Sequence, residues 1–287
     1  MSALVSVIVP AYNREALVEE TLESILRQSY RDRETLIVDD GSSDETAQVV
    51  RTWLVHHSDA RGKLLTMKKN SGKSAAVNAG VAESRGEYIA ILDSDDLLEP
   101  DTLARQVAFL EKHPECGMVF GLARMLEADG SAGHLEGGIG LNRDSLDFVG
   151  DAGDLLLRVN PIVSSSVLMR RSAVIRVGVL NDRLRYVHDW EYWIRLSGVS
   201  KIGFLHAPLV RYRVSSPNSS SANRIGTFKE VAALLELRKT APQTGRLGSL
   251  MRHVRFYMLL SFRDGRLLDA VHILALGCVH TLKVIFR

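Results

Sequence analysis

Residues 86–96 read GEYIAILDSDD, a short apolar run that ends in three carboxylates. Such a run, bounded by glycine and acidic residues, is typical of a buried strand in a parallel sheet. Similar apolar runs occur at 4–9, 35–38 and 64–67, and the segments between them carry apolar residues at helical spacing. Short strands that alternate with helices predict βαβ units, and therefore an α/β fold with a mostly parallel central sheet flanked by helices.

Further elements follow from the same patterns. Ser42 and Glu45, three residues apart, predict a capping box at the start of the helix after the second strand. Pro100 favours the first turn of a helix. The other expectations are helices at 18–26, 43–54, 74–83 and 190–196, strands at 165–169 and 201–205, irregular structure over the glycine-rich stretch 126–153, a polar segment at 215–223 and helices toward the C-terminus.

The bulk composition excludes several classes of protein. The 287 residues are 46% hydrophobic, which is enough for a sizeable core. The formal net charge is only +2, so no nucleic-acid partner is expected. Cys116 and Cys278 lie far apart in the sequence, which argues against a disulfide framework or a zinc site. This cysteine usage fits a reducing cytosol. No basic segment precedes the first apolar run, so the N-terminus is not expected to be a signal peptide.

Polar clusters follow three of the predicted strands. In an open α/β sheet, ligands bind at the carboxyl ends of the strands, so we expect these clusters to meet at one edge of the sheet. They are Pro10 to Asn13 after the first strand, Asp39 to Ser42 after the second, and Asp93 to Asp95 after the fourth.

Asp93 and Asp95 alternate on a short segment after an apolar strand. Two carboxylates held in this way can place oxygen ligands on a hard divalent cation. Mg²⁺ or Mn²⁺ would supply the positive charge that a departing phosphate group needs. The alternative is an acidic loop in which Asp95 or Asp96 caps the following helix.

Tyr12, Asp39 and Asp40 are candidates for binding a nucleoside. A carboxylate at this edge can accept the imide proton of uracil or thymine, and Tyr12 offers a face for stacking. The alternatives are a turn before a helix and plain packing of the ring. Lys73 belongs to a Gly-Lys-Ser sequence, but Met67 stands where a phosphate-binding loop needs its first glycine. The position of Lys73 after the third strand still predicts that it lies near a diphosphate, with a solvated surface lysine as the alternative.

An acidic residue also opens a later amphipathic helix, which begins His188, Asp189, Trp190, Glu191. A carboxylate placed here can act as the general base that takes the proton from an attacking hydroxyl group. The alternative is a helix cap with Trp190 and Trp193 in the core.

The chain resembles the family 2 glycosyltransferases through five segments that follow one another in the family's order. They are VSVIVPAYNRE, LIVDDGSSDET, NSGKSAAVNAG, GEYIAILDSDD and HDWEYWIRL. The resemblance covers about residues 4 to 213. It implies the GT-A nucleotide-sugar transferase fold and the transfer of a sugar from a nucleotide diphosphate to an acceptor hydroxyl, with inversion at the anomeric carbon.

The resemblance also implies roles for individual residues. Asp93 and Asp95 would form the DxD motif that binds Mg²⁺ or Mn²⁺, with Asp95 as the more direct ligand. Asp189 would be the catalytic base, and the family's Glu-Asp pair reads His188-Asp189 in this chain. The expected contacts with the nucleotide sugar are Pro10, Ala11, Tyr12, Asn13, Glu15, Asp39, Asp40, Lys73, Asp93 and Ser94.

These features predict the domains and partners of the protein. A GT-A domain is expected at 1–215 and a helical C-terminal extension at 216–287. The apolar stretch 271–286 is shorter than a bilayer span, so we expect it either to pack on the main domain or to touch the inner membrane surface peripherally. The expected donor is a nucleotide sugar, with a UDP-sugar first, and the expected acceptor is a saccharide or lipid-linked saccharide of cell-surface glycan synthesis. The expected location is the cytoplasm.

Two other functions are compatible with parts of the sequence. A sugar nucleotidyltransferase also combines an α/β sheet with carboxylate-bound Mg²⁺, but it would carry a glycine-rich basic signature where this chain has PAYNRE. The other is a noncatalytic module that binds nucleotide sugars. The presence of Asp93, Asp95 and Asp189 in this chain argues against such a loss of catalysis.

Overall fold

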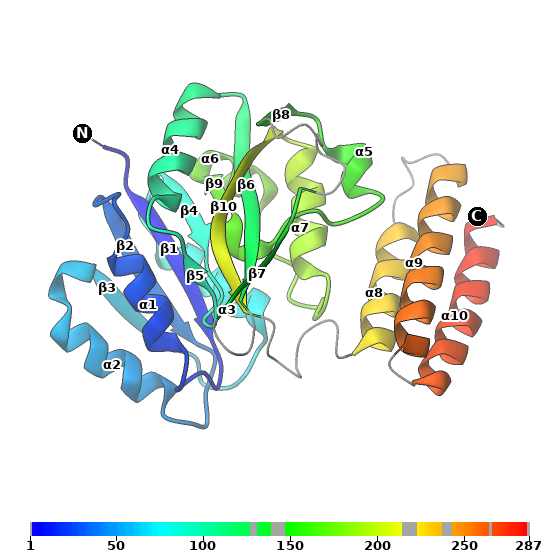
Figure 1. Cartoon of the computed structure of the whole chain (residues 1–287), viewed down its shortest axis with the longest axis horizontal. Coiled ribbons are helices and arrows are strands. Elements are labelled where there is room, and N and C mark those ends of the chain that lie inside the picture. The colour runs from blue at the N-terminus through cyan, green and yellow to red at the C-terminus, as the bar shows by residue number, and fades with distance from the viewer. Residues whose placement is uncertain are drawn as a thin grey trace.

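A mixed sheet, ten-stranded within the described residues, forms the centre of the protein (Figure 1). The computed structural model describes residues 2–126, 131–138, 147–213, 223–236, 243–263 and 266–285. The strands are β1 (Val5–Ala11), β2 (Arg33–Asp39), β3 (Gly62–Thr66), β4 (Tyr88–Ile91), β5 (Leu97–Leu98), β6 (Cys116–Leu126), β7 (Ala132–Glu136), β8 (Phe148–Gly150), β9 (Leu168–Arg170) and β10 (Lys201–Arg213). Their order is β3-β2-β1-β4-β9-β6-β10-β5, with β7 paired to β6 and β8 paired to β10.

Helices cover both faces of the sheet, as the sequence predicts. They are α1 (Val18–Leu26), α2 (Thr46–His56), α3 (Lys73–Glu83), α4 (Thr102–Lys112), α5 (Gly153–Leu156), α6 (Arg171–Val177), α7 (His188–Ser197), α8 (Arg224–Glu236), α9 (Gln243–Arg263) and α10 (Leu267–Ile285). α1, α2 and α4 share a core with one face, and α3 and α5 to α7 share a core with the other. α8, α9 and α10 stand side by side beyond α5 and α7, at the right of Figure 1.

The first strand is apolar on both faces, apart from Ser6, whose buried hydroxyl is hydrogen-bonded to Glu34 and Gly86. Val5, Val7 and Val9 pack with α1 on one face of the sheet, whereas Ile8 packs with Val77 of α3 on the other. All five side chains are completely buried. A strand that is covered on both faces is apolar at most positions, and its buried polar side chains are hydrogen-bonded.

The half of the sheet that carries the predicted site is parallel. β1 pairs in parallel with β2 and β4, and β2 pairs in parallel with β3. β9 then runs antiparallel to both β4 and β6, while β10 is parallel to β6. Because β1, β2 and β4 run in the same direction, their carboxyl ends lie at one edge.

Parts of the second half differ from the sequence expectations. The sequence pattern does not predict β6, because a continuous apolar run lacks the period that separates a strand from a buried helix. The stretch 126–153, expected to be irregular, contains β7 and β8, while 127–130 and 139–146 lie outside the described residues. The strand expected at 165–169 begins instead as a 3₁₀ turn at Ser164–Ser166 that leads into β9. Of the polar segment 215–223, all but Asn223 lies outside the described residues.

Helix α2 begins three residues later than the sequence predicts, and the expected capping box is wrong. Oδ1 of Asp44 accepts the backbone N–H of Thr46 at 3.0 Å, and Oε2 of Glu15 accepts that of Glu45 at 2.8 Å. The hydroxyl of Ser42 instead accepts an N–H from the loop after β1. Asp44 and Glu15 therefore satisfy the N–H groups that the start of the helix leaves unpaired.

We expect Asp44→Ala to lower the free energy of unfolding by about 1 kcal/mol at neutral pH. Burial raises the pKa of Asp44, but its hydrogen bonds from Thr46 and Glu15 together bring that pKa below the ordinary value. The stabilisation is therefore present above the ordinary carboxyl pKa and is lost as the pH falls through the lowered one. Urea unfolding near neutral pH and near pH 2 measures the difference, with the exposed Asp59→Ala as the control. An equal cost at both pH values would contradict the assignment.

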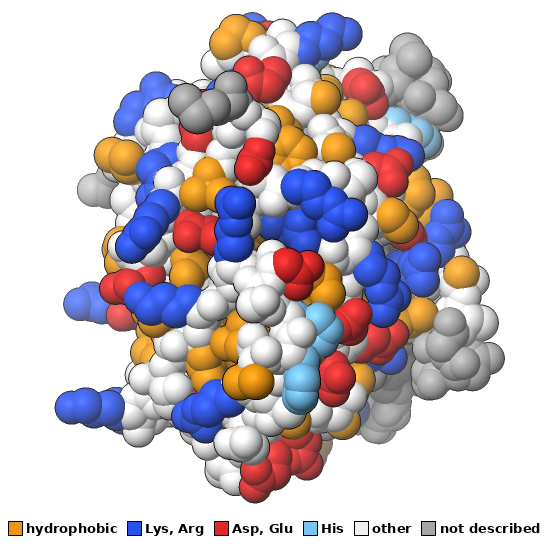
Figure 2. Space-filling view, turned by 90° about the vertical axis from the view of Figure 1, so that its left-hand side faces the viewer, with side chains coloured by type: hydrophobic (Ala, Val, Ile, Leu, Met, Phe, Trp, Pro, Cys, Tyr) orange, Lys and Arg blue, Asp and Glu red, His pale blue; other side chains and the backbone are white. Residues whose placement is uncertain are grey.

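The surface carries charges of both signs. Figure 2 shows the face at the left of Figure 1, where Lys and Arg side chains are interspersed with Asp and Glu. This mixture agrees with the formal net charge of +2. Among the helices that the structure describes, none combines the length and the apolar character needed to cross a bilayer.

Candidate functional site

The structure brings residues from three distant segments to the carboxyl edge of the parallel strands. Ala11 at the end of β1 lies opposite Asp39 at the end of β2. Asp93 follows the neighbouring strand β4, and Lys73 is the first residue of α3. Nζ of Lys73 lies 2.5 Å from Oδ1 and 2.7 Å from Oδ2 of Asp93. The convergence that the strand order requires is therefore present.

A tight turn holds the acidic run 93–96. The N–H of Asp96 donates to the carbonyl of Asp93 at 3.0 Å. The Ser165 hydroxyl accepts the N–H of Asp93 at 3.1 Å and donates to Oδ2 of Asp96 at 2.5 Å. The N–H of Arg213 donates to the other oxygen of Asp96 at 2.9 Å. Asp96 is buried, and the hydrogen bonds to both of its oxygens fix the conformation of the turn.

Two basic side chains accompany the accessible carboxylates of this turn. Ser94 is buried, while the side chains of Asp93 and Asp95 keep 25% and 16% of their surface exposed. Lys73 pairs with Asp93, and Nε of Arg14 lies 3.3 Å from Oδ2 of Asp95. Each predicted metal ligand thus has a cationic partner in the protein.

These charges shift one another's protonation. Burial lowers the pKa of Lys73, but Asp93 more than offsets this effect and leaves that pKa above its ordinary value. Burial and the charge of Asp93 raise the pKa of Asp95, against the opposing charges of Arg14 and Lys73. The pKa of Asp96 is raised well above the ordinary carboxyl value, because burial and two neighbouring carboxylates act in the same direction. Lys73 is therefore charged at neutral pH.

Asp40 fastens the loop after β3 to the loop after β2. Its Oδ1 accepts the N–H of Ser71 and its Oδ2 accepts that of Gly72, each at 2.8 Å. The next residue, Gly41, has a φ of +70°, and a Cβ there would lie 2.7 Å from the carbonyl carbon of Lys69. Both oxygens of buried Asp40 are thus used inside the protein. Its predicted contact with a nucleoside stays a prediction.

The other predicted nucleotide contacts include one exposed aromatic residue. Tyr12 is 37% exposed, so part of this aromatic residue is accessible to a ligand. Asn13 has a φ of +52°, and its Oδ1 accepts the N–H of Ser43 at 2.9 Å. Oδ1 of buried Asp39 accepts the N–H of Ser42 at 3.2 Å. Of the remaining members, Pro10 and Ala11 are buried in β1, and Glu15 accepts the N–H of Glu45 at the start of α2.

Asp189 lies in the first turn of α7. Its Oδ1 accepts the N–H of Trp190 at 2.6 Å, and the side chain is partly exposed. The charge of Asp189 contributes to the raised pKa of Lys73, after the larger effect of Asp93, so the start of α7 lies within electrostatic range of Lys73. His188 is buried, and this burial lowers its pKa against the opposing charge of Asp189. The imidazole of the His-Asp pair is therefore neutral at physiological pH.

The two accessible carboxylates, Asp93 and Asp95, fit a divalent cation that is shared with a phosphate group. Mg²⁺ in nucleotide sites takes one or two protein carboxylates and completes its shell with phosphate oxygens and water. No cluster of three or more His, Cys, Asp or Glu side chains that could hold a metal ion occurs in the part of the chain that the structure describes. The donor set therefore suits an ion that arrives with a diphosphate.

Arg14, Ser165 and Arg213 belong to the same cluster, although the sequence analysis assigned them no role. Arg14 directly follows the predicted residues at the end of β1, so its position was a usable signal. Arg213 donates to the carbonyl of Asp95 at 3.2 Å and pairs with Glu20 at 2.7 Å. Ser165 had no signal in the sequence, because its place at the site depends on the 3₁₀ turn.

Known proteins with related sequences carry glycosyltransferase names. The family model described as glycosyl transferase family 2 matches residues 6–151. EpsE of Bacillus subtilis (strain 168), named as a glycosyltransferase, is 34% identical over 193 residues, which make up 67% of this chain and 66% of that protein. An uncharacterized glycosyltransferase of Rickettsia bellii (strain RML369-C) is 29% identical over 221 residues, which make up 77% of this chain and 30% of that protein. The chain thus spans less than two thirds of the length of both relatives.

Solved structures share the fold of this chain at lower identity. A structure titled as S. aureus TarS 1-349 in complex with UDP aligns with a TM-score of 0.65 and 19% identity, over 91% of this chain and 74% of that chain. The mannosyltransferase PcManGT from Pyrobaculum calidifontis, in complex with GDP-Man and Mn²⁺, aligns with a TM-score of 0.66 and 22% identity, over 97% of this chain and 76% of that chain. These likenesses confirm the GT-A fold. Since the family model matches just over half of the residues, the chain belongs to glycosyl transferase family 2.

Proposed function

We propose that this chain is a metal-dependent, inverting glycosyltransferase that moves a sugar from a nucleotide diphosphate to an acceptor hydroxyl. The observation that carries the proposal is the gathering of Asp93, Asp95 and Lys73 at one edge of the sheet, with Asp189 close enough for its charge to help raise the pKa of Lys73, in a chain of glycosyl transferase family 2. Metal ligands, a phosphate-binding cation and a base are the groups that this reaction needs.

The basic side chains of the site are placed to bind a diphosphate. Asp93 and Asp95 would hold Mg²⁺ or Mn²⁺, which supplies Lewis-acid stabilisation of the leaving diphosphate when it is bound. Lys73 and Arg14 now pair with the same two carboxylates. Because the pKa of Lys73 is raised, its ammonium stays charged and can exchange Asp93 for a phosphate oxygen.

Asp189 is the proposed general base. Direct displacement at the anomeric carbon requires the acceptor hydroxyl to lose its proton as it attacks, and a single displacement inverts the configuration. The neutral imidazole of His188 adds no positive charge beside Asp189, so the carboxylate keeps its capacity to accept that proton.

A UDP-sugar is the proposed donor and a saccharide or lipid-linked saccharide of cell-surface glycan synthesis the proposed acceptor. Structural neighbours support a nucleotide sugar, since TarS structures are titled with UDP and UDP-GlcNAc and the PcManGT structure with GDP-Man. The partly exposed Tyr12 is available to stack on the base. Family membership favours sugar transfer over nucleotidyl transfer.

The test is the incubation of the protein with Mn²⁺ and a panel of UDP-, GDP- and dTDP-sugars, with water or simple saccharides as acceptors. Proton NMR follows the anomeric signals with time. From an α-linked donor, we expect the β-anomer to appear first. First appearance of the α-anomer would contradict inversion, and binding without consumption of any donor would favour the noncatalytic module.

We further propose that α9 and α10 hold the protein at an anionic membrane surface, near a lipid-linked acceptor. Ala270 and Ile273 face the core, while the opposite side of α10 exposes apolar side chains, with Leu268 86% exposed. Arg252 and Arg255 are exposed on the neighbouring α9. Apolar side chains next to arginines suit the interface of an anionic bilayer. The exposed large apolar residues of the two helices are Met251, Phe256, Leu259, Leu268, Val271, Leu274 and Val279.

Co-sedimentation with lipid vesicles tests this contact. We expect binding to phosphatidylcholine vesicles that contain phosphatidylglycerol, and weaker binding without the anionic lipid. The double substitution Leu268→Glu and Val271→Glu should weaken binding by at least about tenfold, because two exposed side chains lose their insertion. Val55→Glu, at an exposed apolar position of α2, is the matched control. A protein that stays in the supernatant with both kinds of vesicle would contradict the contact.

A further inference from the structure

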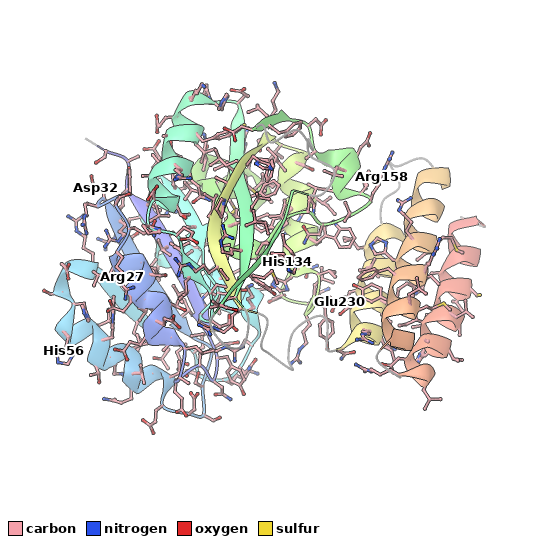
Figure 3. The ribbon with its side chains drawn as sticks, viewed as in Figure 1. Arg27, Asp32, His56, His134, Arg158 and Glu230 are labelled. Atoms are coloured by element: carbon pink, nitrogen blue, oxygen red, sulfur yellow. The ribbon has the colours of Figure 1, made fainter. Side chains whose placement is uncertain are left out.

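The carboxylate of Glu230 on α8 accepts three hydrogen bonds from the segment 185–187, which leads into α7. Oε1 of Glu230, on α8, accepts the backbone N–H of Arg185 at 2.9 Å, and Oε2 accepts those of Tyr186 and Val187 at 2.8 and 3.1 Å. The next residue, His188, is the first of α7. Figure 3 labels Glu230 on α8, at the side that faces the main domain. One side chain thus binds three consecutive N–H groups.

These hydrogen bonds to Glu230 help to fix the position of Asp189. The carbonyl of Val187 accepts the N–H of Glu191 at 2.9 Å, which is a hydrogen bond of the first turn of α7. Val187 is therefore held by Glu230 through its N–H and by the helix through its carbonyl. Hydrogen bonds to a charged acceptor are stronger than those between neutral groups. Asp189 follows two residues later on the same rigid turn.

Other contacts also fix the position of the C-terminal helices against the residues around the start of α7. Nδ2 of Asn223 donates to the Tyr186 hydroxyl at 2.6 Å. A Cβ at Gly226 would lie 2.5 Å from the ring of Tyr186, so this glycine allows the close approach. The rings of Trp190 and His253, on α9, lie 5.4 Å apart between centroids. α8 therefore contacts the chain before the proposed base, and α9 contacts the residue after it.

We infer that Glu230 is a positioning residue for Asp189, and that α8 is needed for full turnover because it carries Glu230. This inference rests on the proposed function, in which Asp189 acts as the base. Glu230 lies on α8 and reaches the reaction through the backbone of 185–187. Displacement of a catalytic group by about 1 Å can cost about a hundredfold in rate, so a residue that fixes the start of α7 controls turnover without a contact to the substrate.

Glu230→Gln is the variant that tests the inference. Glutamine keeps the shape of the side chain, but it replaces one accepting oxygen by an NH₂ group, which faces at least one N–H of 185–187 donor to donor. We expect the turnover number to fall by about ten- to a hundredfold, while the dissociation constant of the donor with Mn²⁺, measured by calorimetry, stays within about twofold. Unchanged turnover, or equal losses of turnover and donor affinity, would overturn the inference.

Asn223→Ala is the matched control. Asn223 directly precedes α8, and its replacement removes both the bond to the Tyr186 hydroxyl and the bond that its Oδ1 accepts from the N–H of Gly226 at 2.9 Å. The three backbone hydrogen bonds to Glu230 stay in place. We expect turnover within about threefold of the parent protein, and a fall as large as that of Glu230→Gln would mean that seating of the helix, rather than the carboxylate, matters.

Hydrogen exchange provides a readout that does not depend on activity. The amides of 185–187 should exchange faster in Glu230→Gln than in Asn223→Ala or the parent protein. Unchanged exchange rates of these amides would contradict the hydrogen bonds between Glu230 and residues 185–187. If the parent protein consumes no nucleotide sugar, the proposed function has failed, and the exchange rates still decide whether Glu230 orders this segment.

Discussion

Asp189→Asn should lower the turnover number by about 10²- to 10⁴-fold and leave the affinity for the donor within about twofold. Asparagine keeps the size of the side chain and an oxygen that can accept the N–H of Trp190, so the first turn of α7 is preserved. It cannot take a proton from the acceptor hydroxyl. The measurements are initial rates at saturating donor and calorimetric titration of the donor with Mn²⁺.

Glu191→Gln is the control on the same helix. Glu191 pairs with Arg195 one turn further along α7, at 2.8 Å, so its removal disturbs the helix surface rather than the proposed base. Turnover should change little, because glutamine keeps an oxygen that can accept from Arg195, and Arg195 also donates to the carbonyls of Val177 and Val179. A loss of donor affinity in Asp189→Asn as large as its loss of turnover would assign Asp189 to donor binding instead.

Asp95→Ala should weaken Mn²⁺-dependent donor binding by more than about tenfold. Substitution of residues that merely support a metal ligand already costs about ten- to a hundredfold in affinity, and a direct ligand should cost at least as much. The affinity that remains should respond weakly to EDTA. Calorimetric titration of the donor with Mn²⁺ and with EDTA gives both values.

Asp101→Ala is the matched control for the loss of an aspartate near this turn. Asp101 pairs with Arg105 on the surface of α4, at 2.8 Å, and both side chains are about half exposed. This variant should bind the donor as the parent protein does. An unchanged Mn²⁺ dependence in Asp95→Ala would remove Asp95 from the metal site.

Much of the parallel half of the fold could be predicted, because β1, β2 and β4 are largely buried, although the edge strand β3 is partly exposed. A largely buried strand is mostly apolar, with hydrogen-bonded Ser6 as the exception in β1, and the runs at the positions of β1, β2 and β4 are each followed by polar residues. Parallel direction then forces Asp39 and Asp93 to one edge. Local patterns and the geometry of a parallel sheet are therefore enough to place these two residues together.

The remainder depends on contacts that local patterns do not encode. Ser165 reaches the acidic turn because a 3₁₀ turn replaces the expected strand. Asn78 on α3 holds the segment before α7 through two hydrogen bonds with the backbone of Leu180, at 2.8 and 2.9 Å. Glu230 reaches the same segment from α8, 43 to 45 residues away in the sequence. Pairings over such distances follow from the packed fold and leave no spacing signal.

The roles of the polar residues in the loops after β1 and β2 could not be predicted from residue type either. The type of residue at 13, 39 and 40 indicated ligand contacts, yet the side chains of Asn13, Asp39 and Asp40 accept N–H groups from neighbouring loops. A carboxylate or amide at a strand end can serve a ligand or a loop with the same chemistry. Composition alone does not separate the two roles.

Calorimetric titration of UDP into the protein, with Mn²⁺ and then with EDTA, tests the central claim most directly. GDP and dTDP serve as competitors of the same charge. We expect saturable binding of UDP with Mn²⁺ that is largely lost with EDTA, because Asp93 and Asp95 offer a cation two carboxylates and leave its other positions to the diphosphate. Absence of binding by all three nucleotides, or binding that EDTA leaves unchanged, would contradict a metal-dependent nucleotide-sugar site at this edge of the sheet.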